Sequence, residues 1–377
     1  MKKINWSFKK KMMMKLMNNL INIPIPLNIS LFWNLGFLLS INMFIQILLG
    51  LFLSINYINN NVFDNIFNIY YNMNYGWMLR IMHSNMSSFI FILIYMHILR
   101  NIYYNNFKNL MMWMSGMMML IMLMLIAFSG YILPWSQMSY WGAMVITNLL
   151  STIPIIGNKM MMLLWGNFNI NLLTLNRFFT IHFIFPMILM LLIIIHLNIL
   201  HLNKSSNPMG ILNKIDLIKL NPYFMMKDLI MMIFFMLIFM NMNLIFPFML
   251  NNTDNFIKMS YLNTPNHIEP EWYFLFFYSI LRSINNKLGG FIMMIMSLFM
   301  LLIMPIMYNQ NFQSLKFYYI NKFFFWFMIM ILIILTWLGM MEIEYPYNML
   351  NKIFMMNYFF FFFIYMMMLK MSDLLMK

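Results

Sequence analysis

The stretch HSNMSSFIFILIYMH, residues 83–97, is almost entirely apolar, but it begins and ends with histidine. A histidine inside a membrane is costly unless its ring finds a partner, so such a residue usually marks a functional site. The two histidines are 14 positions apart, which is about 21 Å along a helix axis. Steps of about 100° bring the second ring to within about 40° of the first. We therefore expect one helix face to bind something at two depths.

The composition is that of a chain that crosses a membrane several times. Of its 377 residues, 63% are hydrophobic and 8% are charged, whereas a soluble domain carries about 25% charged residues. Eight apolar segments are long enough to cross a bilayer, which takes about 20 residues each. They are residues 31–54, 76–104, 110–133, 174–201, 225–247, 287–308, 319–339 and 346–369. The expected fold class is therefore all-α, a polytopic transmembrane bundle of about eight helices.

Two long connections, 134–173 and 248–286, are still apolar and rich in tryptophan. We expect them to lie in the membrane interface rather than to form separate domains. The expected division is an N-terminal part, residues 1–205, with spans one to four, and a C-terminal part, residues 206–377, with spans five to eight.

The basic residues gather on one side of the expected bundle. They are Lys2, Lys3, Lys9, Lys10, Lys11, Lys15, Arg100, Lys108, Lys204, Lys214, Lys219, Lys227, Lys316 and Lys322. On the opposite side, residues 55–75 contain no Lys or Arg. The positive-inside rule then places both termini inside. The net charge of +14 follows from this bias and from attraction to anionic lipid, and it needs no nucleic acid as partner.

Residue usage limits the metal chemistry and suggests a source. The chain has no cysteine, which excludes disulfides, cysteine-ligated zinc or iron–sulfur clusters, and thioether-attached haem. The 54 methionines, with abundant Ile, Asn, Phe, Lys and Tyr, indicate an AT-rich mitochondrial genome in which an extra codon is read as Met. An AT-rich bacterial genome is the alternative.

The fourth span carries a second histidine pair, His182 and His196, again 14 positions apart. The second and fourth spans run in the same direction, so His83 should lie at the depth of His182, and His97 at the depth of His196. Two imidazoles with no open position suit haem used for electron transfer. The alternative is that each histidine is an isolated polar residue bonded to a neighbouring helix.

Glycines repeat with the same period in two other spans. Gly36 and Gly50 lie in the first span, and Gly116 and Gly130 in the third. Without a Cβ, each glycine would let a flat macrocycle approach the backbone closely. Helix–helix contact at small residues is the alternative.

Three arginines lie near the histidine pairs in the sequence. Arg80 and Arg177 lie near the outer pair, and Arg100 near the inner pair. Each guanidinium could pair with a haem propionate. The alternative is that these side chains snorkel at helix ends.

Several motifs then add a family resemblance. They are YGWMLRIMH (75–83), AFSGYILPW (127–135), SQMSYWGAMVITNLLSTIPIIG (136–157), TLNRFFTIHF (174–183), SSNPMGI (205–211), HIEPEWYFLFFYSILRS (267–283) and NKLGG (286–290). Together they resemble the cytochrome b family, the haem subunits of ubiquinol–cytochrome c reductase (complex III). The resemblance implies a bundle of eight helices, two non-covalent b-type haems between the second and fourth helices, and two sites for ubiquinone or ubiquinol.

The resemblance also implies which residues form the quinone sites. The outer quinol site maps onto Glu271, Tyr131, Gly142 and Tyr278, and the inner quinone site onto His201 and Asp228. A carboxylate in an aromatic pocket can accept a quinol proton, and a histidine with an acid can supply the two protons of quinone reduction. Without the motifs these side chains would read as a solvated interfacial acid and as polar helix ends.

The expected function is transmembrane electron transfer coupled to proton movement. An electron would leave quinol for an iron–sulfur protein and a cytochrome c-type subunit of the same complex, and reach cytochrome c indirectly. A second electron would cross through the haems to quinone on the matrix side of the mitochondrial inner membrane. The resemblance also implies a homodimer of the complex. A proton-coupled transporter or channel without haem, with the histidines and Glu271 as a relay, is the alternative.

Five residues depart from the family pattern. The family usually has glycine where this chain has Met86, Leu99, Asn101 and Ser136, and a basic residue where it has Glu269. None of these changes removes an expected haem ligand. Met86 and Leu99 bear on the packing near the haems.

Overall fold

The computed structural model describes residues 23–58, 61–210, 214–307 and 310–375. Within these residues, eight helical segments are long and apolar enough to cross a membrane, which confirms the expected bundle. The helices are α2 (Leu35–Ile55), α4 (Gly76–Tyr103), α5 (Leu110–Ile132), α8 (Leu172–Asn203), α9 (Tyr223–Ile245), α11 (Lys287–Ile306), α12 (Tyr319–Met340) and α13 (Tyr347–Leu375). The six N-terminal lysines that contributed to the orientation lie outside the described residues.

The observed bounds lie within a few residues of the expected ones, and the contacts explain why two of the helices begin earlier or end later than expected. Helix α8 begins before residue 174 because the Asn171 side chain accepts hydrogen bonds from the backbone N–H groups of Leu173 and Thr174, a capping box. Helix α13 continues past residue 369 because its last turn carries the buried Asp373. That carboxylate accepts a hydrogen bond of 2.6 Å from the Tyr318 hydroxyl and one of 3.1 Å from the Asn311 backbone N–H.

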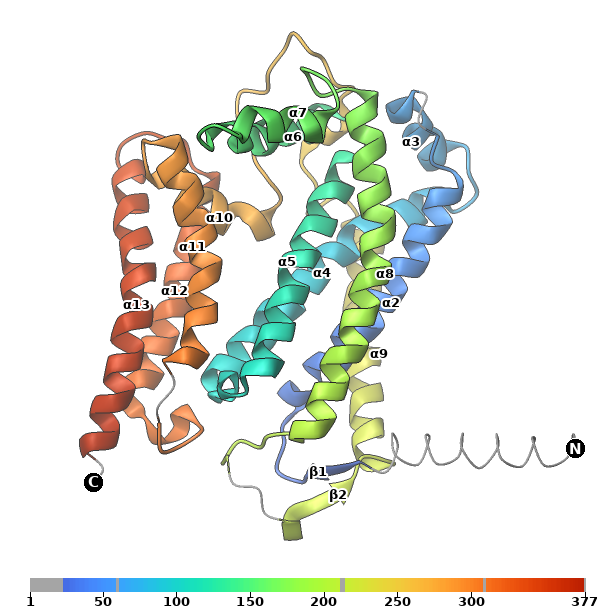
Figure 1. Ribbon diagram of the computed structural model, residues 1–377. Helices are drawn as coiled ribbons and strands as arrows, with labels where there is room; N and C mark the ends of the chain where they lie inside the picture. Colours follow the sequence, from blue (N-terminus) through green and yellow to red (C-terminus); the bar gives the residue numbers. More distant parts are fainter. Residues whose placement is uncertain (1–22, 59–60, 211–213, 308–309, 376–377) are drawn as a thin grey trace, which may run out of the picture.

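The helices form two groups that lie side by side (Figure 1). In the first group α2 packs against α4 and α5 packs against α8, with α9 along the edge. In the second group α11, α12 and α13 surround the short helix α10 (Trp272–Ser283). Helix α10 is buried among these helices, whereas the sequence pattern predicts an interfacial position for 248–286. The reason is that Tyr273, Leu275 and Ile280 are hydrophobic side chains that pack in the core.

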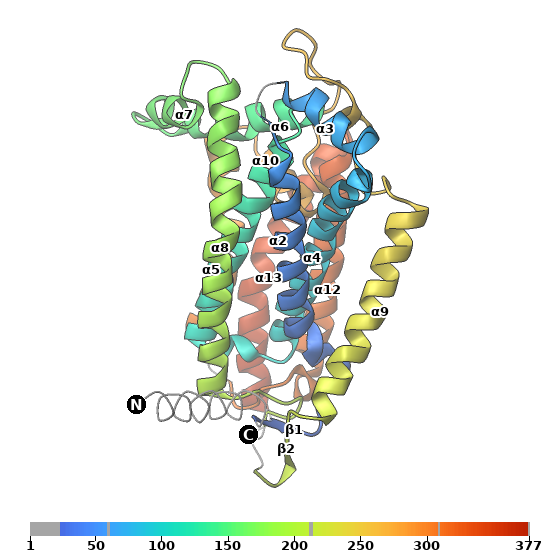
Figure 2. The same cartoon turned by 90° about the vertical axis from the view of Figure 1, so that its right-hand side faces the viewer.

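Short elements close the two ends of the bundle. The helices α3 (Val62–Tyr71), α6 (Gln137–Asn148) and α7 (Gly157–Trp165) lie at one end (Figures 1 and 2). At the other end β1 (Pro24–Pro26) pairs antiparallel with β2 (Leu217–Lys219), a small sheet that the sequence pattern does not indicate. Figures 1 and 2 show that the last turn of α13 lies at the same end of the bundle as strand β1.

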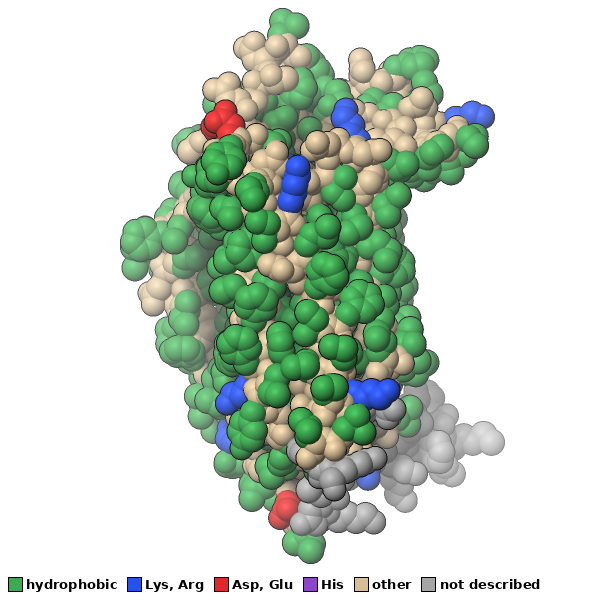
Figure 3. Space-filling view, turned by 90° about the vertical axis from the view of Figure 1, so that its left-hand side faces the viewer, with side chains coloured by type: hydrophobic (Ala, Val, Ile, Leu, Met, Phe, Trp, Pro, Cys, Tyr) green, Lys and Arg blue, Asp and Glu red, His purple; other side chains and the backbone are tan. Residues whose placement is uncertain are grey.

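The outer surface fits the interior of a bilayer. Figure 3 shows one face of the molecule on which hydrophobic side chains cover the middle, while Lys and Arg side chains appear towards the two ends. Many large apolar side chains of α8 and α9 are exposed, among them Leu191, Ile194, Ile230 and Phe234. This arrangement leaves apolar side chains for contact with lipid.

One buried polar link ties the peripheral helix α9 to the bundle. The Asn85 side chain of α4 donates to Asn243 Oδ1 and to the Pro247 carbonyl, each at 2.9 Å. The Asn243 amide in turn donates to the Phe239 carbonyl at 2.7 Å. In a membrane such bonds between helices hold elements together that have no hydrophobic driving force to associate.

We predict that Asn85→Leu lowers the free energy of unfolding by about 1 kcal/mol, because it leaves the Asn243 and Pro247 oxygens without their donor. The measurement is thermal unfolding of the purified protein in detergent. The control is a double-mutant cycle with Asn243→Leu, in which the double variant should lose less than the sum of the single losses. Strict additivity would contradict the link.

Candidate functional site

Two cavities lie between the helices of the first group, one towards each end of the bundle. The outer cavity lies towards α3 and α6 and has a volume of about 230 Å³. His83 of α4 and His182 of α8 both line it. The inner cavity offers about 250 Å³ and is lined by His97 and His196 of the same two helices. The structure thus brings the four histidines together in the two pairs that their spacing predicts.

The outer pair has the separation of two ligands on one metal ion. The ring centres of His83 and His182 are 6.2 Å apart, and the ring planes are at 85° to one another. Two metal–nitrogen bonds of about 2.0 Å and two imidazole radii of about 1.1 Å would give about 6.2 Å between the centres of opposed ligands. The distance between the ring centres therefore fits one ion bound by both rings.

A hydrogen bond at Nδ1 of a histidine ring determines whether Nε2 keeps a lone pair that can bind a metal ion. The His182 Nδ1 lies 2.8 Å from the Ile126 carbonyl, which can only accept, so Nδ1 carries the proton and Nε2 keeps its lone pair. The His196 Nδ1 lies 2.7 Å from the Ser115 hydroxyl. Among the described residues, the buried Nδ1 atoms of His83 and His97 have no hydrogen-bond partner.

Each of the four spaced glycines faces one of these rings. A Cβ on Gly50 would lie 3.0 Å from His83 Cε1, and a Cβ on Gly130 would overlap the His182 ring. At Gly36 and Gly116 the added Cβ would meet the His97 and His196 rings at the ordinary contact distances of 3.8 and 3.7 Å. The glycines therefore leave room for the histidine rings, and the clearance is smaller in the outer cavity than in the inner one.

The arginines do not share one role. Arg80 lines the outer cavity, and Arg100 lines the inner cavity, where it donates to Asn101 Oδ1 at 2.8 Å. No carboxylate of the described residues forms an ion pair with either guanidinium. Arg177 does not line the outer cavity, because its guanidinium donates to the carbonyls of Leu163 and Leu164 at the end of α7.

The outer cavity extends from the histidines to a carboxyl group. Glu271, the residue before α10, and Tyr131 both line it. The Tyr131 hydroxyl accepts a hydrogen bond of 3.2 Å from the Asn255 amide. Burial raises the pKa of the Glu271 carboxyl to about 7, although the positive charge of Arg80 acts in the opposite direction. A group of this kind can exchange a proton near neutral pH.

The same cavity reaches the apolar outer surface of the bundle. Its lining includes Leu51, Phe183 and Met187, whose exposed fractions are 36%, 44% and 40%. These three side chains belong to α2 and α8, so the cavity opens at those two helices.

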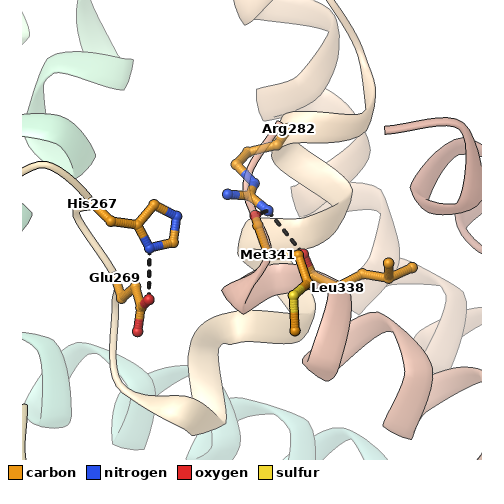
Figure 4. A network of polar contacts seen from close by, with 5 residues as sticks. All are labelled: His267, Glu269, Arg282, Leu338 and Met341. Atoms are coloured by element: carbon orange, nitrogen blue, oxygen red, sulfur yellow. Dashed lines mark hydrogen bonds and ion pairs between the residues drawn. The ribbon is translucent and has the colours of Figure 1, made fainter. Parts of the chain in front are cut away.

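The segment before α10 carries a polar pair (Figure 4). A carboxylate oxygen of Glu269 lies 2.6 Å from His267 Nδ1. Further along, Arg282 donates to the carbonyls of Leu338 and Met341 at 2.9 and 2.7 Å, which fixes α10 to the end of α12.

The remaining quinone-site candidates lie apart from the cavities. The Tyr278 ring lies under the Arg282 guanidinium at 4.7 Å and does not line the outer cavity. Gly142 lies near Tyr131, whose Cε1 would be 4.0 Å from an added Cβ. His201 is exposed near the end of α8, and Asp228 is half-buried near the start of α9, and neither lines the inner cavity.

The departures from the family pattern have local partners. Met86 is fully buried in the core of the first helix group, and Leu99 packs against the core of the second. Asn101 accepts hydrogen bonds from Arg100 and from the Asn106 amide. Ser136 caps α6 in a capping box and donates to Asn255 Oδ1 at 2.8 Å.

Sequence reasoning missed two residues that contact the histidines. Ser115 meets His196, and the Gln46 amide donates to the His83 backbone carbonyl at 2.9 Å. A signal existed for Ser115, because serine precedes glycine at both spaced positions of the third span, in Ser115–Gly116 and in Ser129–Gly130.

Comparisons with known proteins show the family of the chain. The family model described as cytochrome b/b6/petB matches residues 20–204, and the model described as cytochrome b (C-terminal)/b6/petD matches residues 258–359. Cytochrome b of Apis mellifera ligustica is 46% identical over 282 residues, which are 75% of this chain and 73% of that protein. A chain of a hyperthermophilic respiratory complex III superposes with a TM-score of 0.92 at 26% identity, covering 98% of this chain and 99% of that one. The chain thus belongs to the cytochrome b family.

Proposed function

We propose that the two cavities each hold a b-type haem, with His83 and His182 as axial ligands in the outer cavity and His97 and His196 in the inner one. The observation that carries this proposal is the 6.2 Å between the His83 and His182 ring centres. The glycine clearances and the free lone pair on His182 Nε2 fit the same group. When bound, such a haem accepts and passes on single electrons.

The family defines the reaction. The chain is a core subunit of ubiquinol–cytochrome c oxidoreductase, or complex III, which oxidises quinol and transfers electrons. The comparisons give no support to a transporter or channel without haem. As a cytochrome b homologue with eight helices that could cross a membrane, it is a multi-pass membrane protein.

At the outer site, Glu271 accepts a proton from quinol. Its carboxyl is buried, it lines the same cavity as the histidines, and its pKa of about 7 makes it half-ionised at neutral pH. Tyr131 lines the wall beside it. Tyr278 packs under the Arg282 guanidinium, and Gly142 lies beside Tyr131. These two residues therefore contribute to the packing of α10 and of Tyr131.

Arg80 and Arg100 hold the carboxylates of the haem propionates, since each lines a cavity and lacks a carboxylate partner among the described side chains. Arg177 fixes the end of α7 to α8 instead. At the inner site His201 and Asp228 supply protons to quinone.

The remaining assignments follow the charge bias and the family. Both termini face the matrix of the mitochondrion, and residues 1–205 and 206–377 form the haem-binding part and the C-terminal part. The partners are an iron–sulfur protein and a cytochrome c-type subunit, with cytochrome c as the final acceptor, in a complex that is a homodimer. The match to a complex III chain supports the presence of further subunits.

We predict that His97→Ala or His196→Ala removes the inner haem and that His83→Ala or His182→Ala removes the outer one, since each loses one of two axial bonds. The measurement is the haem content per chain, with visible spectra of the purified complex. Thr180→Val is the control, because Thr180 lies two residues before His182 but its exposed side chain bonds to the Arg177 carbonyl and does not line the outer cavity. Two haems per chain in His97→Ala would refute the assignment.

The glycine clearances predict unequal effects of one added methyl group. Gly130→Ala and Gly50→Ala should lose the outer haem, because the new Cβ displaces the His182 or His83 ring. Gly36→Ala and Gly116→Ala should keep the inner haem, because their added Cβ makes an ordinary contact. Separate quantification of the two haems checks this order, and equal retention in all four variants would contradict it.

The two half-reactions should separate in Glu271→Gln and Asp228→Asn. Glu271→Gln removes the proton acceptor and should slow quinol oxidation by about 100-fold. It should also abolish the rise in rate as the pH passes through about 7, because only the ionised carboxyl accepts a proton. With the outer site inhibited, quinol can reduce the haems only through the inner site. Asp228→Asn should impair that reduction in stopped-flow measurements and Glu271→Gln should not, whereas the reverse pattern would exchange the two sites.

A further inference from the structure

The third span repeats the pair Ser–Gly at both haem depths, but its two serines make different bonds. Ser115 precedes Gly116 beside the inner cavity, and Ser129 precedes Gly130 beside the outer one. The Ser115 hydroxyl contacts a histidine ring directly. The Ser129 hydroxyl bonds only to carbonyls of its own helix, those of Leu125 and Ile126, at 2.8 and 3.0 Å.

The single proton of the Ser115 hydroxyl determines the direction of its bonds. The oxygen lies 2.8 Å from the Met112 carbonyl and 2.7 Å from His196 Nδ1. A carbonyl cannot donate a hydrogen bond. The hydroxyl therefore donates to the Met112 carbonyl and accepts a hydrogen bond from Nδ1–H of the ring. This arrangement satisfies all three groups. It also leaves the lone pair on His196 Nε2, the nitrogen that would bind a metal.

The outer site reaches the same tautomer by another route. There the His182 Nδ1–H meets the Ile126 backbone carbonyl at 2.8 Å, and the Ser129 hydroxyl lies 3.0 Å from that same carbonyl. The tautomer of the outer ring therefore depends on a backbone carbonyl, which a side-chain substitution does not remove. The inner ring depends on one side-chain hydroxyl, which can be removed.

We propose that Ser115 is a positioning residue for the inner axial ligand: it fixes the tautomer and orientation of His196 and lowers the reduction potential of the inner haem. An acceptor on Nδ1–H gives the imidazole more anionic character, which makes it a stronger donor to iron and favours the oxidised state. This inference rests on the proposed ligation of a haem by His97 and His196.

The test is a redox titration of the intact complex, in which the inner and outer haems are followed by their visible absorbance. Ser115→Ala and Ser115→Val remove the acceptor. They should raise the ratio of reduced to oxidised inner haem at a fixed ambient potential by about three- to tenfold, where tenfold corresponds to about 59 mV for one electron. Ser115→Thr keeps a hydroxyl that can bond the same carbonyl, so its ratio should stay within about twofold of the unaltered chain.

The threonine and valine variants form the matched pair, because they have the same shape and differ in the hydroxyl. Ser129→Ala is the second control and should leave the inner haem unchanged. If Val and Ala lose the inner haem while Thr retains it, the hydroxyl is again responsible. Equal behaviour of Thr and Val, in potential or in haem content, overturns the proposal. A chain without two b-type haems before any substitution would refute the proposed ligation instead.

Discussion

The arrangement of the bundle depends on two imidazoles that face each other between parallel helices. His83 meets His182 in one cavity and His97 meets His196 in the other, and both pairs can meet only if α4 and α8 run in the same direction. An apolar membrane interior offers no water to satisfy unpaired ring nitrogens, so the neighbouring helices must supply partners or space. Helix α5 supplies both, through the carbonyl of Ile126 and the missing side chain of Gly130.

The period of 14 residues extends this constraint along the helix axis. It returns each helix to nearly the same face, so one pair of helices can repeat the arrangement about 21 Å away. Glycines on α2 and α5 repeat with it, and each of them faces a ring. The two sites are nevertheless unequal, because the outer glycines leave less room than the inner ones and the two Nδ1–H groups meet different acceptors.

The spans and the histidine pairs could be predicted because hydrophobicity, charge and helical periodicity are local properties of the sequence. The burial of α10 could not, because Trp272–Ser283 is too short to span and its environment comes from α11, α12 and α13. The position of Arg177 also escaped prediction. Its partners are backbone carbonyls of α7, which carry no signal in the sequence.

The opening of the outer cavity at α2 and α8 affects how a substrate is delivered. The exposed rim of Leu51, Phe183 and Met187 is apolar, so a molecule entering there comes from the bilayer and not from water. Its concentration at the opening is then set by partition into the membrane. Each methylene group of a tail contributes about 0.8 kcal/mol to that partition without touching the protein. Apparent affinity therefore reflects the lipid phase as much as the contacts inside the cavity, and encounter takes place by diffusion in two dimensions.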